Sequence, residues 1–139
     1  QDLILDHNRK PRNFKKIENP THKAEGFNPL CGDQFWIYLR VGKNNLIEDI
    51  SFEGKGCAIS KASASMMSLQ VKGKTLEDFE ILFNQFRDYL KGNPADHEKL
   101  GRLSVFSSVW KYPSRVKCAI LAWHTLHGAI SDEKKVSTE

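Results

Sequence analysis

The stretch DQFWIYLRVGKNNLIEDISFE, residues 33–53, decides the fold expected for this chain of 139 residues. Apolar and polar side chains alternate along residues 33–41, which is typical of a strand with one buried face. Residues 42–45 read Gly-Lys-Asn-Asn and predict a tight turn, and residues 46–53 then form the returning strand. With a weaker strand at residues 23–27, the pattern predicts a small three-stranded antiparallel sheet.

Helical patterns flank this sheet on both sides in the sequence. The expected helices are residues 2–9, which end before Pro11, residues 58–71, residues 76–90 behind a Thr75 cap, and a last helix that starts at Pro113. Strands followed by helices are typical of an α+β fold with two layers around one core. Residues 1–139 are therefore expected to form a single domain, with residues 131–139 as a flexible polar tail.

Composition places the chain among folded globular proteins without a membrane segment. Hydrophobic residues make up 40% and charged residues 27%, and the net charge is +4. The longest apolar run is too short to cross a bilayer and no signal peptide is visible, so a cytoplasmic location is expected. The basic stretch Arg9–Lys16 is either a solvated face or a docking patch for an acidic protein. Nucleic-acid binding is not expected, because the basic residues of this stretch do not alternate with aromatic residues.

The three cysteines Cys31, Cys57 and Cys118 point to metal or thiol chemistry. Their odd number and the expected reducing compartment disfavour a disulfide framework. Each lies at a boundary between predicted elements, and Cys57 and Cys118 fall in the first turns of helices, where the helix dipole favours a thiolate. Asp33 completes a set of four ligands that zinc or iron would accept. Spacing alone leaves a second interpretation open, in which the three cysteines are unrelated core residues.

Other candidate sites in the sequence are weaker. His124 and His127 lie one helical turn apart but lack a third metal ligand, so a surface pair is expected. The serines of the helix at residues 58–71 lack the histidine and carboxylate of a hydrolase, and they predict close helix packing instead. Gly54 and Gly56 precede a helix but lack the lysine and hydroxyl residue of a phosphate loop, which argues against nucleotide binding.

Four motifs, in the same order, resemble those of the U-type iron–sulfur cluster assembly proteins. They are Asp6-His-Asn-Arg-Lys-Pro-Arg-Asn13, Asn28-Pro-Leu-Cys-Gly-Asp33, Gly54-Lys-Gly-Cys-Ala-Ile-Ser60 running on through Ala62-Ser-Ala-Ser-Met-Met67, and Arg115-Val-Lys-Cys-Ala-Ile-Leu-Ala-Trp123. The resemblance extends from about residue 4 to about residue 130 of this chain. Because several motifs recur together, the resemblance is highly specific.

Three departures from the IscU branch of that family favour its SufU branch. IscU-type proteins have a histidine immediately before the third cysteine, where this chain has Lys117. The segment Trp110–Lys117 has only a partial likeness to the Leu-Pro-Pro-Val-Lys chaperone site of IscU-type proteins. The stretch between Cys57 and Cys118 is also longer than the corresponding stretch in IscU-type proteins.

A SufU-type resemblance implies a zinc ion held by Cys31, Asp33, Cys57 and Cys118. It also implies that Cys31, on a loop, accepts persulfide sulfur from a SufS-like cysteine desulfurase, and that the sulfur is released for cluster building, with a downstream Suf scaffold as a further partner. The chain is then a sulfurtransferase-like partner of the desulfurase rather than an independent enzyme. The alternative is an IscU-type scaffold that assembles a transient 2Fe–2S cluster, or holds iron, on the same residues. A closed, purely structural zinc site is a third interpretation.

Overall fold

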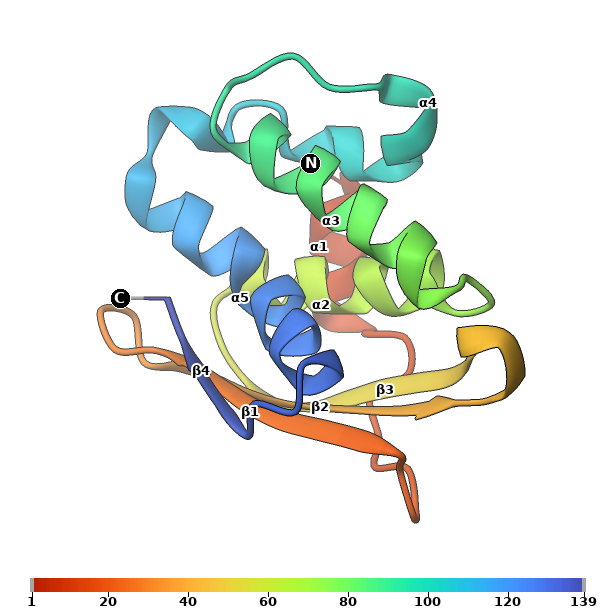
Figure 1. The fold of residues 1–139 in the computed structure, drawn as a ribbon. Helices are drawn as coiled ribbons and strands as arrows, with labels where there is room; N and C mark the ends of the chain where they lie inside the picture. Colours follow the sequence, from red (N-terminus) through yellow and green to blue (C-terminus); the bar gives the residue numbers. More distant parts are fainter. Residues whose placement is uncertain (1, 139) are drawn as a thin grey trace.

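A four-stranded sheet forms one layer of the molecule, and helices cover one of its faces (Figure 1). The computed structural model describes residues 2–138. The strands are β1 (His22–Asn28), β2 (Asp33–Val41), β3 (Ile47–Lys55) and β4 (Lys135–Ser137), in the spatial order β3-β2-β1-β4. The first three pair antiparallel, as the sequence predicts, and the α+β expectation is confirmed.

Five α-helices make up the second layer. They are α1 (Asp2–Arg9), α2 (Ala58–Val71), α3 (Leu76–Leu90), α4 (His97–Leu100) and α5 (Pro113–Ile130). Short 3-10 turns occur at Lys43–Asn45, Gly101–Phe106 and Val109–Lys111. Every helix expected from the sequence is present, and Thr75 caps α3 by accepting a hydrogen bond from the Asp78 N–H at 3.1 Å. The α4 turn and the two 3-10 turns after it were not predicted, because they are too short to show a periodic apolar pattern.

The core lies between the sheet and helices α2, α3 and α5. Alternate residues of β2 point toward these helices, and Phe35, Ile37 and Leu39 are fully buried. Helix α5 packs across β1 and β2, and Trp123 on α5 is the largest fully buried side chain. Gly26 on β1 permits this close approach, since a Cβ at that position would overlap the side chain of Thr125.

The C-terminal segment differs from the expected flexible tail. Residues 135–137 form β4, which pairs in parallel with Glu25–Phe27 of β1, so the sheet has four strands and is mixed rather than three-stranded and antiparallel. Val136 is half-buried, and it packs against Gly128 of α5. The strand was missed because one apolar residue among polar neighbours carries no strand pattern of its own. The pairing comes instead from the open edge of β1, whose backbone groups need partners.

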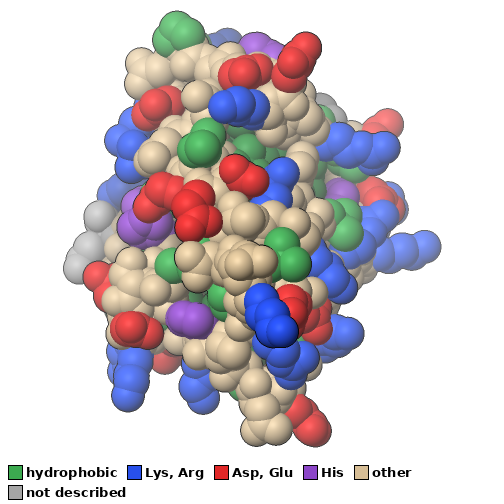
Figure 2. All heavy atoms as spheres, turned by 45° about the vertical axis from the view of Figure 1, so that its right-hand side comes forward, with side chains coloured by type: hydrophobic (Ala, Val, Ile, Leu, Met, Phe, Trp, Pro, Cys, Tyr) green, Lys and Arg blue, Asp and Glu red, His purple; other side chains and the backbone are tan. Residues whose placement is uncertain are grey.

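On the face drawn in Figure 2, basic and acidic side chains are intermingled. Within residues 2–138, no helix combines the length and the apolar character that crossing a bilayer requires.

Candidate metal centre

A tight turn between β1 and β2 places Cys31 at the surface. The Asn28 carbonyl accepts hydrogen bonds from the N–H groups of Cys31, at 3.2 Å, and Gly32, at 2.8 Å. The Asn28 side-chain oxygen accepts a third bond from the Leu30 N–H at 3.2 Å. Gly32 has φ +75°, a left-handed conformation that favours glycine. This turn leaves Cys31 and Leu30 exposed while Asn28, at its base, is fully buried.

Asp33 connects this turn to the start of α2. It is the first residue of β2, lies opposite Asn28 in the register of the hairpin, and is only 2% exposed. Its Oδ1 accepts a hydrogen bond from the backbone N–H of Cys57 at 3.0 Å. The next strand pair, Gln34 with Lys55, brings the end of β3 alongside, so the register of the sheet itself brings Asp33 and Cys57 together.

Cys57 is the N-cap residue of α2. Its Sγ accepts a hydrogen bond from the Ser60 N–H at 3.5 Å, while the Ser60 hydroxyl donates to the Cys57 carbonyl at 3.1 Å. The Sγ atom lies 4.0 Å from Asp33 Oδ2, and the residue is exposed. Gly56 keeps this approach open, because a Cβ there would lie 2.4 Å from the Ser60 hydroxyl oxygen.

Cys118 lies on α5, at the buried side of the site. It is 3% exposed, and its Sγ lies 3.5 Å from the Sγ of Cys31. The Asn28 amide donates to the same Cys118 sulfur at 3.8 Å. Cysteines that are far apart in the sequence therefore share one site, and all three are free thiols.

The donor set of this site suits a thiophilic metal ion. The ligand atoms of Cys31, Asp33 and Cys118 all lie within 4.8 Å of one another. Cys57 lies at the margin of this group, beside Asp33. Soft thiolate sulfurs with a single carboxylate oxygen are ligands that zinc and iron both accept. The arrangement does not fit three unrelated core cysteines, since two of the thiols are exposed and the three come from different elements.

The thiols differ in how readily they ionise. A hydrogen bond from Cys118 lowers the pKa of the Cys57 thiol below its ordinary value, and the hydrogen bonds from Ser60 lower it further. That bond to Cys57 raises the pKa of Cys118, and burial adds to the rise. The expectation that both helix positions favour a thiolate is correct for Cys57 and wrong for Cys118. Cys118 is the sixth residue of α5, beyond the free N–H groups of the first turn.

Two residues of the site were not singled out from the sequence. Asn28 organises the turn and contacts the Cys118 sulfur, and Ser60 holds Cys57 at the start of α2. A signal for Asn28 exists, because an asparagine before Pro29 is typical of a turn in which the side chain bonds to backbone N–H groups. The role of Ser60 depends on its position in the first turn of α2, where Cys57 is the N-cap residue. Residue propensities do not predict this contact.

The remaining candidates lie apart from this site or serve packing. His127 forms a hydrogen bond with Glu80 at 3.0 Å and stacks on Phe83, so it does not join a metal cluster among residues 2–138. The serines of α2 are buried and bonded to neighbouring elements. Ser63 donates to the Ala119 carbonyl of α5, and Ser65 bonds to His7 of α1 at 2.7 Å. Close helix packing through small residues is therefore confirmed.

Comparison with known families gives the family of the chain. The model of the NifU-like N-terminal domain matches residues 1–119, a range that contains Cys31, Asp33, Cys57 and Cys118. This chain belongs to the NifU-like N-terminal domain family. The resemblance to U-type proteins is thus confirmed at the level of the family.

Relatives within this family carry both branch names. The chain is 36% identical over 135 residues to the zinc-dependent sulfurtransferase SufU of Bacillus subtilis, covering 96% of this chain and 90% of that protein. It is 46% identical over 139 residues to the iron–sulfur cluster assembly scaffold protein IscU 1 of Archaeoglobus fulgidus, covering 99% of this chain and 85% of that protein.

A solved structure shows the same fold. The crystal structure described as a putative iron–sulfur cluster assembly scaffold protein for the SUF system from Fervidobacterium islandicum superposes with a TM-score of 0.89. The two chains are 36% identical, and the match covers 94% of this chain and 95% of the other. The comparisons therefore establish the family and the fold. They do not distinguish the SufU branch from the IscU branch.

Proposed function

We propose that this protein is an iron–sulfur cluster assembly component of SufU type, which holds zinc and accepts persulfide sulfur from a cysteine desulfurase. The ligands in this proposal are Cys31, Asp33, Cys57 and Cys118. The observation that carries it is the pairing of an exposed thiol on a turn, Cys31, with buried Cys118 and Asp33 directly behind it. A similar relative whose name describes a zinc-dependent sulfurtransferase supports the same chemistry.

Cys31 is the sulfur acceptor in this proposal because it is the least anchored of the three thiols. Cys118 is buried inside α5, and Cys57 is fixed by its bonds to Ser60 at the start of α2. Cys31 is exposed on the β1–β2 turn, and its Sγ has a hydrogen-bond partner only in Cys118 among the described residues. A persulfide carried by another protein can reach it with little rearrangement of this chain.

The transfer itself balances without an external oxidant or reductant. The Cys31 thiolate attacks the outer sulfur of the persulfide on the desulfurase cysteine. One S–S bond forms between Cys31 and that sulfur, while the S–S bond in the desulfurase breaks and its cysteine leaves as a thiolate. Because an attacking thiolate has to be free, Cys31 must be able to leave a shared metal site while the other donors stay in place.

Zinc, when bound, keeps thiolates deprotonated at neutral pH without redox chemistry of its own. The residues of this chain allow one ligand to exchange. The carboxylate of Asp33 is a harder donor than the three sulfurs, so the set is held less tightly than four cysteines would be. Asp33 Oδ1 accepts a hydrogen bond from the Cys57 N–H, and Oδ2 lies 4.0 Å from the Cys57 sulfur.

An IscU-type scaffold, which assembles a 2Fe–2S cluster on the same residues, is the second candidate. The 46% identity to the Archaeoglobus fulgidus scaffold favours it. The residue before Cys118 favours the first candidate, because Lys117 replaces the histidine expected of an IscU-type protein. The long segment between α2 and α5, which contains α3 and the turns after it, supports the SufU branch in the same way.

The partners in this proposal are a SufS-like cysteine desulfurase and, after transfer, a downstream Suf scaffold. The setting is the cytoplasm, and residues 1–139 act as one domain. We also propose that the basic stretch Arg9–Lys16 and the turn around Cys31 face the desulfurase together. Lys15 and Lys16 are exposed, which suits a charged contact of this kind.

Metal analysis of freshly purified protein, paired with a desulfurase activity assay, tests the proposal. A colourless protein with about one zinc per chain that accelerates a cysteine desulfurase is the expected result. A brown protein with iron and labile sulfide, and without effect on the desulfurase, contradicts the sulfur-acceptor function and establishes the scaffold. Zinc without any effect on the desulfurase leaves only a structural site and contradicts both candidates.

A further inference from the structure

Two thiols of this chain lie close enough to react with each other. The Sγ atom of Cys118 lies 3.5 Å from the Sγ atom of Cys31, although the two residues are 87 positions apart in the sequence. The S–S distance in a disulfide is about 2.05 Å, so a displacement of roughly 1.5 Å joins the two sulfurs. Cys31 is exposed on the β1–β2 turn, whereas Cys118 is only 3% exposed. An oxidant in solution therefore meets the sulfur of Cys31 first.

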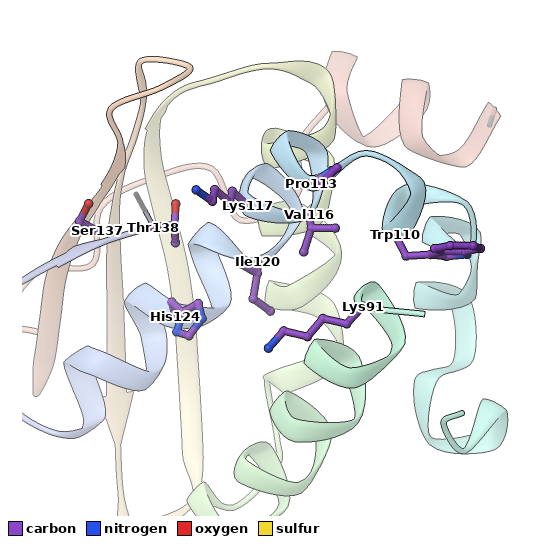
Figure 3. Close-up of a pocket in the computed structure, with 9 residues that line it drawn as sticks. All are labelled: Lys91, Trp110, Pro113, Val116, Lys117, Ile120, His124, Ser137 and Thr138. Carbon is purple, nitrogen blue, oxygen red and sulfur yellow. The ribbon is translucent and has the colours of Figure 1, made fainter. Parts of the chain in front are cut away.

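The buried sulfur of Cys118 does not face the pocket that opens along α5. Val116, Lys117 and Ile120 line this pocket of about 530 Å³, and Cys118 is not among its lining residues (Figure 3). On the inner side, the fully buried Asn28 donates its amide hydrogen to the Cys118 sulfur at 3.8 Å. Cys118 is thus placed to react with a neighbouring sulfur rather than with a molecule in solution.

Cys57 is the competing partner for Cys118, because these two residues also form a hydrogen bond. Ser60 holds Cys57 at the start of α2 through bonds to both its sulfur and its carbonyl. The Sγ atom of Cys31 has a hydrogen-bond partner only in Cys118 among the described residues, and it lies on a turn rather than on a helix. Cys31 therefore approaches Cys118 with less rearrangement than Cys57 does.

From the short distance between an exposed and a buried sulfur, we propose that Cys31 and Cys118 form a peroxide-sensitive thiol pair that closes into a disulfide. The Cys31 sulfur takes one oxygen atom from hydrogen peroxide and becomes a sulfenic acid, and one water is released. The Cys118 sulfur then attacks the Cys31 sulfur, so that an S–S bond forms and the S–O bond breaks. The hydroxyl group leaves with the proton of Cys118 as a second water. The two thiols lose two electrons in total, and the peroxide gains them.

The disulfide switches off sulfur acceptance, a consequence that rests on the function proposed above. Cys31 in a disulfide has no thiolate with which to attack a persulfide. The same bond removes two sulfur donors from the proposed ligand set, so bound zinc is released. Dithiols reduce a disulfide, which makes the switch reversible. Without Cys118, the sulfenic acid of Cys31 is open to further oxidation to a sulfinic acid, which dithiols do not reduce.

Treatment of the zinc-replete full chain with hydrogen peroxide tests this pair. The remaining thiols are alkylated, the protein is digested without reductant, and the peptides are identified by mass spectrometry. The Cys31 and Cys118 peptides should be joined, and Cys57 should be alkylated. A chromogenic chelator should detect about one released zinc per chain, and dithiothreitol with added zinc should restore the metal-bound protein. A disulfide that includes Cys57, a sulfinic acid on Cys31 without any disulfide, or an unreacted Cys31 would overturn the proposal.

Two matched variants separate the reacting thiol from the loss of a zinc ligand, since each removes one proposed donor. Cys118→Ala should leave a sulfenic acid on Cys31, which dimedone traps, and the disulfide should be absent. Cys57→Ala should still form the Cys31–Cys118 disulfide, and its failure to do so would contradict the pairing. Far-ultraviolet circular dichroism checks that both variants are folded, and the mapping in the unsubstituted protein decides the pairing without them.

The function and the switch can fail independently. If peroxide joins Cys31 to Cys118 but the reduced protein takes no sulfur from a cysteine desulfurase, the proposed function is wrong and the thiol pair stands. If the reduced protein accepts sulfur and peroxide does not join these two cysteines, the thiol pair is wrong and the function stands.

Discussion

Asp33 has two roles at one position, and a conservative substitution separates them. Its Oδ1 accepts the Cys57 N–H, and its charge completes the proposed ligand set. Asp33→Asn retains an oxygen for that hydrogen bond but removes the anionic ligand. Zinc affinity should fall by at least about tenfold while the fold is retained, because an amide oxygen is a poor ligand for zinc.

Competition with a chromogenic zinc chelator measures this loss. Asp49→Asn is the matched control, because Asp49 lies on β3 away from the cysteines and forms an ion pair with Lys72 at 3.5 Å. Equal zinc affinity for Asp33→Asn and for the unsubstituted protein would remove Asp33 from the ligand set.

Asn28 is the residue that fixes the turn of Cys31. Its side chain bonds to the Leu30 N–H and the Cys118 sulfur while fully buried. Asn28→Ala removes both of these hydrogen bonds and leaves a space at a fully buried position, so it should lower the free energy of unfolding by about 1–3 kcal/mol. Urea unfolding measures the change. Asn93→Ala, at an exposed position after α3, should change it by less than about 0.5 kcal/mol, and an equally small change for Asn28→Ala would contradict this account of the turn.

At the residue scale, the sequence pointed to four side chains, of which the structure groups Cys31, Asp33 and Cys118 and places Cys57 beside Asp33, but it did not predict how the thiols ionise. The cysteines and Asp33 could be picked out because each stands at an element boundary within a specific motif. The raised pKa of Cys118 could not be predicted, because it depends on Cys57 and on burial by other elements. The role of Ser60 could not be predicted either, because it depends on the contact of Ser60 with Cys57.

At the scale of single elements, α3 is held by one apolar face. Phe79, Phe83 and Phe86 on this helix are buried as the sequence predicts, and Phe83 is 2% exposed. Phe83→Ala should lower the free energy of unfolding by about 3–5 kcal/mol, because the ring leaves a cavity beside α5. The measurement is chemical denaturation of the metal-bound protein.

Ile81, on the other face of the same helix, is the control for this prediction. It is 46% exposed, so Ile81→Ala should cost less than about 1 kcal/mol. If both substitutions have the same small effect, α3 does not contribute its phenylalanine face to the core as described.

The elements that the sequence missed share one physical property. The long helices were predictable because many residues repeat one pattern, and Ala58–Val71 and Leu76–Leu90 agree with expectation at both ends. The β4 strand, Lys135–Ser137, has three residues and forms only because β1 offers an open edge. Such pairing is a property of two distant segments and has no local signal.

At the scale of the whole molecule, charge should guide association with the desulfurase. Arg12 of the basic stretch is paired with Asp6 at 2.7 Å, whereas Lys15 and Lys16 are exposed. Reversal of both by Lys15→Glu and Lys16→Glu should slow the association rate, and the effect should be largest at low salt, because exposed charges act mainly on encounter.

Stopped-flow binding at several ionic strengths measures this effect. The dissociation rate should change little in the same series. An association rate that is unchanged at low ionic strength would mean that the stretch Arg9–Lys16 is only a solvated face.

The central claim is that Cys31 accepts sulfur while Cys57 and Cys118 stay in place, and mass spectrometry of the cysteine-containing peptides tests it most directly. The zinc-replete protein is mixed with a cysteine desulfurase and cysteine without added reductant, alkylated, and digested. One added sulfur on the peptide that contains Cys31, and none on the other two, is the predicted result. Asp33→Cys, which keeps Cys31 but adds a fourth soft ligand, should reduce that signal. Reproducible added sulfur on the Cys118 or Cys57 peptide, with none on Cys31, would contradict the claim.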